Sequence, residues 1–171
     1  MKLIPCFLTT VLLAATTELK IVVPKDDTTL THPASRDDFV TLARQADSVV
    51  RVKETFRSVS QGTPVVDLDV VEQIVGEPVG HLVIAAAVWD VVAPWNLRRE
   101  NTTFLLLIRK GEEILYVQYN GIPFIHGSGV IPVVDDVVPE GYAYRYDYLC
   151  ILRPISLDII RQQLARANPA N

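Results

Sequence analysis

The stretch TFLLLIRKGEEILYVQY (residues 103–119) carries the clearest structural signal in the chain. Two apolar runs, residues 103–108 and 114–119, flank a short polar segment that contains Gly111. Apolar runs of this length around a glycine-containing polar turn are typical of a β-hairpin. The sequence therefore predicts antiparallel sheet in the second half of the chain.

Further turn signals extend this pattern toward the C-terminus. Asn120-Gly121 and the Gly-Ser-Gly at 127–129 separate two more apolar runs, residues 122–125 and 130–134. A longer strand is predicted from Gly141 to Leu152, and one of its faces carries a row of alternating tyrosines: Tyr142, Tyr144, Tyr146 and Tyr148. Together these segments predict a meander in the C-terminal half.

One helix is predicted before the meander in the chain and another after it. Ser35 followed by Asp38 matches a capping box, and the apolar residues after it recur at helical spacing, which predicts a helix from Ser35 to Val50. Ser156 can cap a second helix over residues 157–167. Helices packed on an antiparallel sheet define the α+β class, which is the predicted fold.

The segments between the first helix and the hairpin are less distinctive. Residues 18–23 and the imperfect alternation of residues 50–59 predict strands. The valine-rich residues 65–75 fit either a strand or a helix, and so does the apolar run 82–89. Glycine and proline at 76–80 predict a turn between these two runs.

Composition limits the classes of protein to which the chain can belong. It has 171 residues, of which 49% are hydrophobic, so residues 1–171 are expected to form one domain with a sizeable core. A formal net charge of −4 gives no electrostatic reason to expect nucleic acid as a partner. Neither Cys6 nor Cys150 lies in a metal-binding or disulfide pattern, and no cofactor is expected.

The N-terminal residues 1–17 have two interpretations. Lys2, the apolar residues after it and Ala14-Ala15 resemble a secretory signal peptide, although Pro5 interrupts the apolar run. If the segment is cleaved, the protein is secreted. If it is retained, the segment belongs to the fold of an intracellular protein or of a subunit in a larger assembly. No apolar run predicts a transmembrane helix.

Acidic and histidine residues supply the candidates for chemistry. Asp67 and Asp69 could bind a divalent cation, although alternate positions of a strand would also place them on a solvated face. His81, His126 and Asp90 are the candidate catalytic residues. The sequence contains no complete set of nucleophile, base and orienting group.

Aromatic residues supply the candidates for binding. The four tyrosines named above, with Trp89 and Trp95, could contact a partner or a planar ligand, and they could equally belong to the core. The sequence thus favours a non-enzymatic structural or interaction protein that binds a protein partner or self-associates as an oligomeric subunit. Two alternatives stay open: a small enzyme or ligand-binding domain with a site inside the curved sheet, and a secreted effector-like domain.

Overall fold

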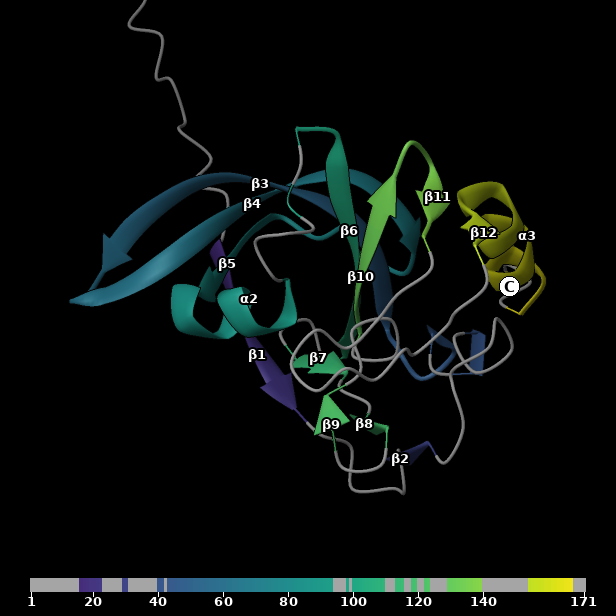
Figure 1. Cartoon of the computed structure of the whole chain (residues 1–171), viewed down its shortest axis with the longest axis horizontal. Coiled ribbons are helices and arrows are strands. Elements are labelled where there is room, and N and C mark those ends of the chain that lie inside the picture. The colour runs from purple at the N-terminus through teal and green to yellow at the C-terminus, as the bar shows by residue number, and fades with distance from the viewer. Residues whose placement is uncertain are drawn as a thin grey trace, which may run out of the picture.

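A computed structural model describes the parts of the chain that form its sheets and helices (Figure 1). The described residues are 16–22, 29–30, 40–41, 43–93, 98, 100–109, 113–115, 118–119, 122–123, 129–139 and 154–167. Within these ranges the protein is mostly antiparallel sheet with two helices, as expected of an α+β protein. No helix in these ranges is both long enough and apolar enough to cross a membrane.

The strands form one large and one small sheet. The large sheet has nine strands in the order β12-β11-β10-β6-β3-β4-β5-β1-β7, and the small sheet has the order β2-β8-β9. The strands are β1 (Thr16–Val22), β2 (Thr29–Leu30), β3 (Ser48–Ser60), β4 (Thr63–Val75), β5 (His81–Ala85), β6 (Thr102–Arg109), β7 (Glu113–Leu115), β8 (Gln118–Tyr119), β9 (Ile122–Pro123), β10 (Val130–Val134), β11 (Val137–Val138) and β12 (Ile155–Ser156). The helices are α2 (Ala86–Val92) and α3 (Leu157–Ala167).

The centre of the large sheet is a Greek key of four strands, which two further strands close into a ring. Strands β3, β4 and β5 pair consecutively, and β6 returns after α2 to lie beside β3, which gives the spatial order β6-β3-β4-β5. Strand β1 pairs in parallel with both β5 and β7, and β7 pairs with β6. The six strands β6, β3, β4, β5, β1 and β7 therefore form a closed ring.

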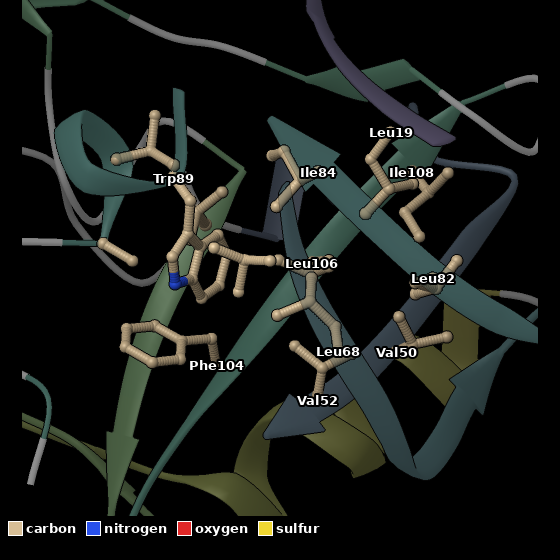
Figure 2. Packing of buried hydrophobic residues seen from close by; sticks show 14 of the residues in the cluster. Leu19, Val50, Val52, Leu68, Leu82, Ile84, Trp89, Phe104, Leu106 and Ile108 are labelled. Atoms are coloured by element: carbon tan, nitrogen blue, oxygen red, sulfur yellow. The ribbon is translucent and has the colours of Figure 1, made fainter. Parts of the chain in front are cut away.

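Side chains that point into this ring form the first hydrophobic core, here called the barrel interior (Figure 2). Strands contribute alternate residues to it, as their two-residue period requires: Val50 and Val52 belong to the interior, whereas Val49, which precedes Val50, faces the other side. Helix α2 inserts Trp89, whose ring meets Phe104 edge to face at 5.1 Å. The buried residues of the barrel interior are Leu19, Val50, Val52, Val66, Leu68, Leu82, Ile84, Ala86, Trp89, Val92, Ala93, Phe104, Leu106, Ile108 and Val130.

A second hydrophobic core lies on the other face of β6 and β10, under α3. Helix α3 buries Leu157, Ile160 and Leu164 there, against Leu105 and Leu107 of β6. The segment that precedes β3 also reaches this core, because Val40 and Ala43 are buried in it. The predicted packing of helices on the sheet is thus confirmed in part, with α3 and the described residues Val40 and Ala43 on this face.

Ion pairs attach α3 to the sheet. Arg161 donates to both carboxylate oxygens of Glu72 on β4, at 2.7 and 2.8 Å, and to Asp158 one turn earlier at 2.6 Å. The hydrogen bonds to Glu72 raise the pKa of Arg161 further, so its charge is permanent. The helix begins as predicted, since the hydroxyl of Ser156 accepts a hydrogen bond from the amide of Asp158 at 3.3 Å.

The predicted helix over residues 35–50 is too long. Among the residues of this segment that the structure describes, 40, 41 and 43 are helical, and the amide of Arg44 donates to the carbonyl of Val40 at 3.0 Å. Strand β3 then begins at Ser48, where Val49 pairs with Leu107 and Val50 with Leu106. Both valines are fully buried, one on each face of the sheet, and this pairing outweighs the helical spacing.

Other strand predictions are confirmed with changes. The hairpin around Gly111 is present, because Ile108 pairs with Ile114, but the predicted second strand is divided between β7 and β8 in different sheets. Residues 65–75 are a strand, and the run 82–89 contains both a strand and the start of α2. The C-terminal meander is found only in part, because β10, β11 and β12 pair consecutively but β10 lies beside β6. The predicted strand from Gly141 to Leu152 lies outside the described residues.

Candidate functional site

The outer half of the β3–β4 hairpin projects from the ring of strands (Figure 1). Strand β3 pairs with β6 only from Ser48 to Val52, and β4 pairs with β5 only from Val65 to Leu68. Residues 53–64, here called the arm, therefore extend beyond the β6 pairing, and residues 59–64, which lie beyond the β5 pairing as well, form a two-stranded end with a tight turn at Gln61-Gly62. Both turn residues have positive φ, 49° and 82°, which suits the twist of a two-residue hairpin turn.

A β-bulge decides which side chains of the arm face which way. The register of β3 against β4 shifts between Glu54 and Phe56, so the alternation changes phase at this point. Beyond the bulge Arg57 pairs with Val66, a residue of the barrel interior, whereas Phe56 pairs with Asp67 on the opposite face. The arm thus has an inner face that continues the barrel interior and an outer face that points away from it.

On the inner face, a polar network joins the arm to α2. Arg57 donates to Asp90 at 2.9 and 3.4 Å and to Glu54 at 2.9 Å. The other carboxylate oxygen of Glu54 accepts a hydrogen bond from the indole nitrogen of Trp89 at 2.7 Å. Arg98 donates to Asp90 at 2.8 Å and to the carbonyl of Trp89 at 3.2 Å. These contacts hold the base of the arm in a defined position.

Two groups of this network, Arg57 and Asp90, keep their charges at neutral pH. The hydrogen bond from Arg57 lowers the pKa of the Asp90 carboxyl below its usual value, and the hydrogen bond from Arg98 adds to this effect. The same contact with Asp90 raises the pKa of Arg57. A carboxylate held by two guanidinium groups is a weak base, so its environment favours a structural role for Asp90 over proton transfer.

On the outer face, three successive strands bring together a second polar cluster. Asp67 of β4 lies at its centre. Its Oδ1 is 2.8 Å from Nε2 of His81 on β5, and its Oδ2 accepts a hydrogen bond from the hydroxyl of Ser58 on β3 at 3.2 Å. The side chain of His81 is 37% exposed and that of Asp67 is 19% exposed, so solvent reaches both. We call Ser58, Asp67 and His81 the outer-face cluster.

This geometry differs from that of a catalytic triad. In a triad the histidine lies between the carboxylate and the nucleophile, where it can take the proton of the hydroxyl. Here Asp67 lies in the middle, and Ser58 donates to the carboxylate instead of to His81. The arrangement orients three polar groups toward a common surface without activating a nucleophile.

The candidate catalytic residues of the sequence do not come together in the described part of the chain. His81 belongs to the outer-face cluster, whereas Asp90 belongs to the network on the inner face. His126 lies outside the described residues. The barrel interior, where the sequence allows a site inside the curved sheet, is filled in the described residues by apolar side chains.

Asp67 and Asp69, the candidate metal ligands, have different interaction partners. Asp67 is engaged by His81 and Ser58, and the exposed Asp69 pairs across the strands with Lys53. Among the described residues, no group of three or more histidine, cysteine, aspartate or glutamate side chains could hold a metal ion. The alternative interpretation of Asp67 and Asp69, as polar residues on one solvated face of a strand, agrees with these contacts.

Of the candidate binding residues, the structure describes one. Trp89 is fully buried, so it contributes to packing rather than to the surface. Trp95 and the four tyrosines, Tyr142, Tyr144, Tyr146 and Tyr148, lie outside the described residues. Phe56, in contrast, is an aromatic residue of the described part with a largely exposed side chain.

Sequence reasoning missed Ser58, Arg57 and Glu54 because their partners are distant in the chain. Arg57 meets Asp90 and Ser58 meets Asp67 only through the pairing of strands and the placement of α2. The bulge was missed for a related reason. An extra residue shifts the alternation by one position, so Val52 and Val59 share the inner face although their spacing is odd.

Comparisons with known proteins do not assign the chain to a family. No protein-family model matches it, and no curated protein or solved structure matches it either.

Proposed function

We propose that this protein is a non-enzymatic interaction protein that self-associates through the inner face of its arm. The observation that carries the proposal is the exposure of Val59, which is 70% accessible although it continues the face that is buried farther along β3. Val59 pairs directly with Pro64, which is also exposed. Two apolar side chains thus stand side by side at the end of the arm.

The backbone of the arm supports the same function. In the described part of the chain, residues 53–60 of β3 have a neighbouring strand only on the β4 side. A free strand edge offers unpaired amide and carbonyl groups to another chain. An identical arm, related by a two-fold axis, supplies such an edge together with a second Val59–Pro64 pair.

The anchoring of the arm lowers the cost of binding. The contacts of Arg57 with Asp90 and of Glu54 with Trp89 position the base of the arm before any partner arrives. A surface that is already ordered loses less conformational entropy on association. The arrangement of Ser58, Asp67 and His81, which activates no nucleophile, supports a binding role rather than a catalytic one.

Sedimentation velocity over a range of protein concentrations tests the proposal. We expect a concentration-dependent dimer in the wild-type protein and a marked loss of association in a Val59→Lys variant, because the charge cannot be buried unpaired. Val71→Lys is the matched control, since Val71 on β4 is 51% exposed and lies outside the arm. A wild-type protein that stays monomeric at high concentration, or a Val71→Lys variant that dissociates as readily as Val59→Lys, would overturn the proposal.

A further inference from the structure

The outer face of the arm differs in chemistry from the inner face. Phe56 is 66% exposed and pairs directly with Asp67, the central residue of the outer-face cluster. Residues that pair in this way have Cβ atoms about 5 Å apart on one face of the sheet. An exposed aromatic ring and an oriented group of hydrogen-bonding side chains therefore lie side by side.

We propose that this surface, formed by Phe56, Ser58, Asp67 and His81, is a binding site for a neutral carbohydrate. A pyranose ring has one apolar face of C–H groups and an edge of hydroxyl groups. The exposed ring of Phe56 offers a flat apolar surface for the first. The outer-face cluster offers acceptors and donors for the second, because a carboxylate, a hydroxyl and an imidazole together can both accept and donate hydrogen bonds.

The geometry of the cluster suits hydroxyl recognition. Each oxygen of Asp67 already has one partner, His81 or Ser58, which holds the carboxylate in a fixed orientation. A carboxylate oxygen can accept more than one hydrogen bond, so both oxygens keep acceptor capacity for a ligand hydroxyl. Among the described residues, none forms a hydrogen bond with Nδ1 of His81, whose side chain is 37% exposed.

The charges around the site disfavour other small ligands. Asp67 and the neighbouring exposed Asp69 would repel a phosphate or carboxylate ligand, and Lys53 is placed opposite Asp69 rather than within the cluster. The described residues also contain no set of three ligands for a metal ion. A neutral ligand rich in hydroxyl groups can form hydrogen bonds with the cluster, and it requires neither a positive charge nor a set of metal ligands at the site.

This site is independent of the association proposed for the inner face. Val59 and Phe56 point to opposite faces of the same strand, so each can be changed without altering the other surface. The Val59→Lys variant is therefore expected to keep carbohydrate binding. A Phe56→Ala variant is expected to keep the association behaviour of the wild-type protein.

Titration of ¹⁵N-labelled full-length protein with maltohexaose, cellohexaose and chitohexaose tests the inference. At ligand concentrations up to about 5 mM, which detect a Kd of about 1 mM, we expect saturable shifts of the Phe56, Ser58, Asp67 and His81 amides with at least one of the three. Phe56→Ala and Asp67→Asn should each weaken that binding about tenfold, as expected for loss of one stacking or charged hydrogen-bonding group. Val71→Ala should bind as the wild type does.

Three outcomes would overturn the inference. The first is the absence of saturable binding by all three oligosaccharides. The second is binding that Phe56→Ala and Asp67→Asn leave unchanged while their spectra remain those of a folded protein. The third is a Phe56→Ala variant that loses self-association instead of carbohydrate binding, which would assign the outer face to a protein partner.

Discussion

Strands β3 and β4 contribute to both the barrel interior and the arm, yet their side chains are buried in one region and mostly exposed in the other. Along β3, residues 48–52 are buried or nearly so, whereas residues 53–60 are mostly exposed. Among the described residues, the buried half has β6 and β4 on its two sides, and the exposed half has β4 alone. Burial in this protein is thus decided by the number of neighbouring strands and not by the apolar character of the strand itself, because Phe56 and Val59 remain exposed.

The largest expected difference between the two regions concerns aromatic side chains. Trp89→Ala should lower the free energy of unfolding by roughly 3–5 kcal/mol, because it leaves a cavity beside Phe104 and removes the indole hydrogen bond to Glu54. Phe56→Ala should change it by less than about 0.5 kcal/mol, since the ring is 66% exposed. Urea unfolding followed by circular dichroism measures both. Equal losses in the two variants would show that the arm is packed against another part of the chain.

Two glycines with similar backbone conformations provide the next comparison. Gly76, at the end of β4, has φ of 85°, and a Cβ atom there would lie 2.0 Å from the carbonyl oxygen of Asp47. Gly62, in the turn of the arm, has φ of 82° and no atom within 4 Å of such a Cβ. Gly62→Ala should cost about 1 kcal/mol for the left-handed conformation alone, and Gly76→Ala roughly 2–3 kcal/mol or more because backbone must also move.

The same urea experiment measures the pair of alanine variants. Each serves as the control for the other, because the conformational term is shared and only the surroundings differ. A Gly62→Ala variant that loses as much stability as Gly76→Ala would mean that the turn of the arm is in contact with other residues.

The anchor between the arm and α2 should make a smaller contribution that depends on pH. The pKa of Asp90 is lowered in the folded protein, so its ion pair stabilises the fold above the unfolded pKa of about 3.9 and the effect is lost as the pH falls through the folded pKa. Because Asp90 is half exposed, we expect Asp90→Asn to cost only about 0.2–1 kcal/mol at pH 7. The difference from wild type should shrink as the pH is lowered toward 2.

Unfolding curves recorded at several pH values for both proteins measure this effect. Asp158→Asn, which removes an exposed partner of Arg161 on α3, is a control for a general response to lost surface charge. A gap between wild type and Asp90→Asn that grows toward acidic pH would contradict the assigned direction of the pKa.

The smallest expected effect on stability is at the end of the arm. Val59→Lys should change the free energy of unfolding by less than about 0.5 kcal/mol, because the side chain is already 70% exposed. Its effect should be on association alone. Measuring its unfolding at a concentration where the wild-type protein is monomeric separates the two properties. A large loss of stability there would mean that Val59 is packed within its own chain.

The local parts of this structure could be predicted from the sequence. The hairpin around Gly111, the strand over residues 130–134 and the capped helix from Leu157 are all present, because turn residues and apolar periodicity act over a few neighbouring positions. The end of the first helix could not be predicted. Val49 and Val50 fit a helical pattern equally well, and their pairing with β6 depends on residues more than fifty positions away.

The candidate sites depended still more on distant contacts. The sequence drew attention to Asp67 and His81, but nothing in it paired one with the other or added Ser58 and Phe56. The bulge between Glu54 and Phe56 places Val52 and Phe56 on opposite faces, although a spacing of four residues in a regular strand would place them on one face. One extra residue in a strand moves every later side chain to the opposite face. The number of apolar residues in the sequence does not show at which position of the strand this residue is inserted.

By itself, the sequence determined that the chain has enough apolar residues for a core, and it located the hairpin around Gly111, the strand over residues 130–134 and the last helix. The closed ring of six strands was decided only by tertiary structure, because the parallel pairing of β1 with β5 and β7 joins residues far apart in the chain. The same holds for the two faces of the arm. Local preferences act within a few residues, whereas a ring, a bulge or a cluster such as Ser58, Asp67 and His81 exists only after separate strands have paired.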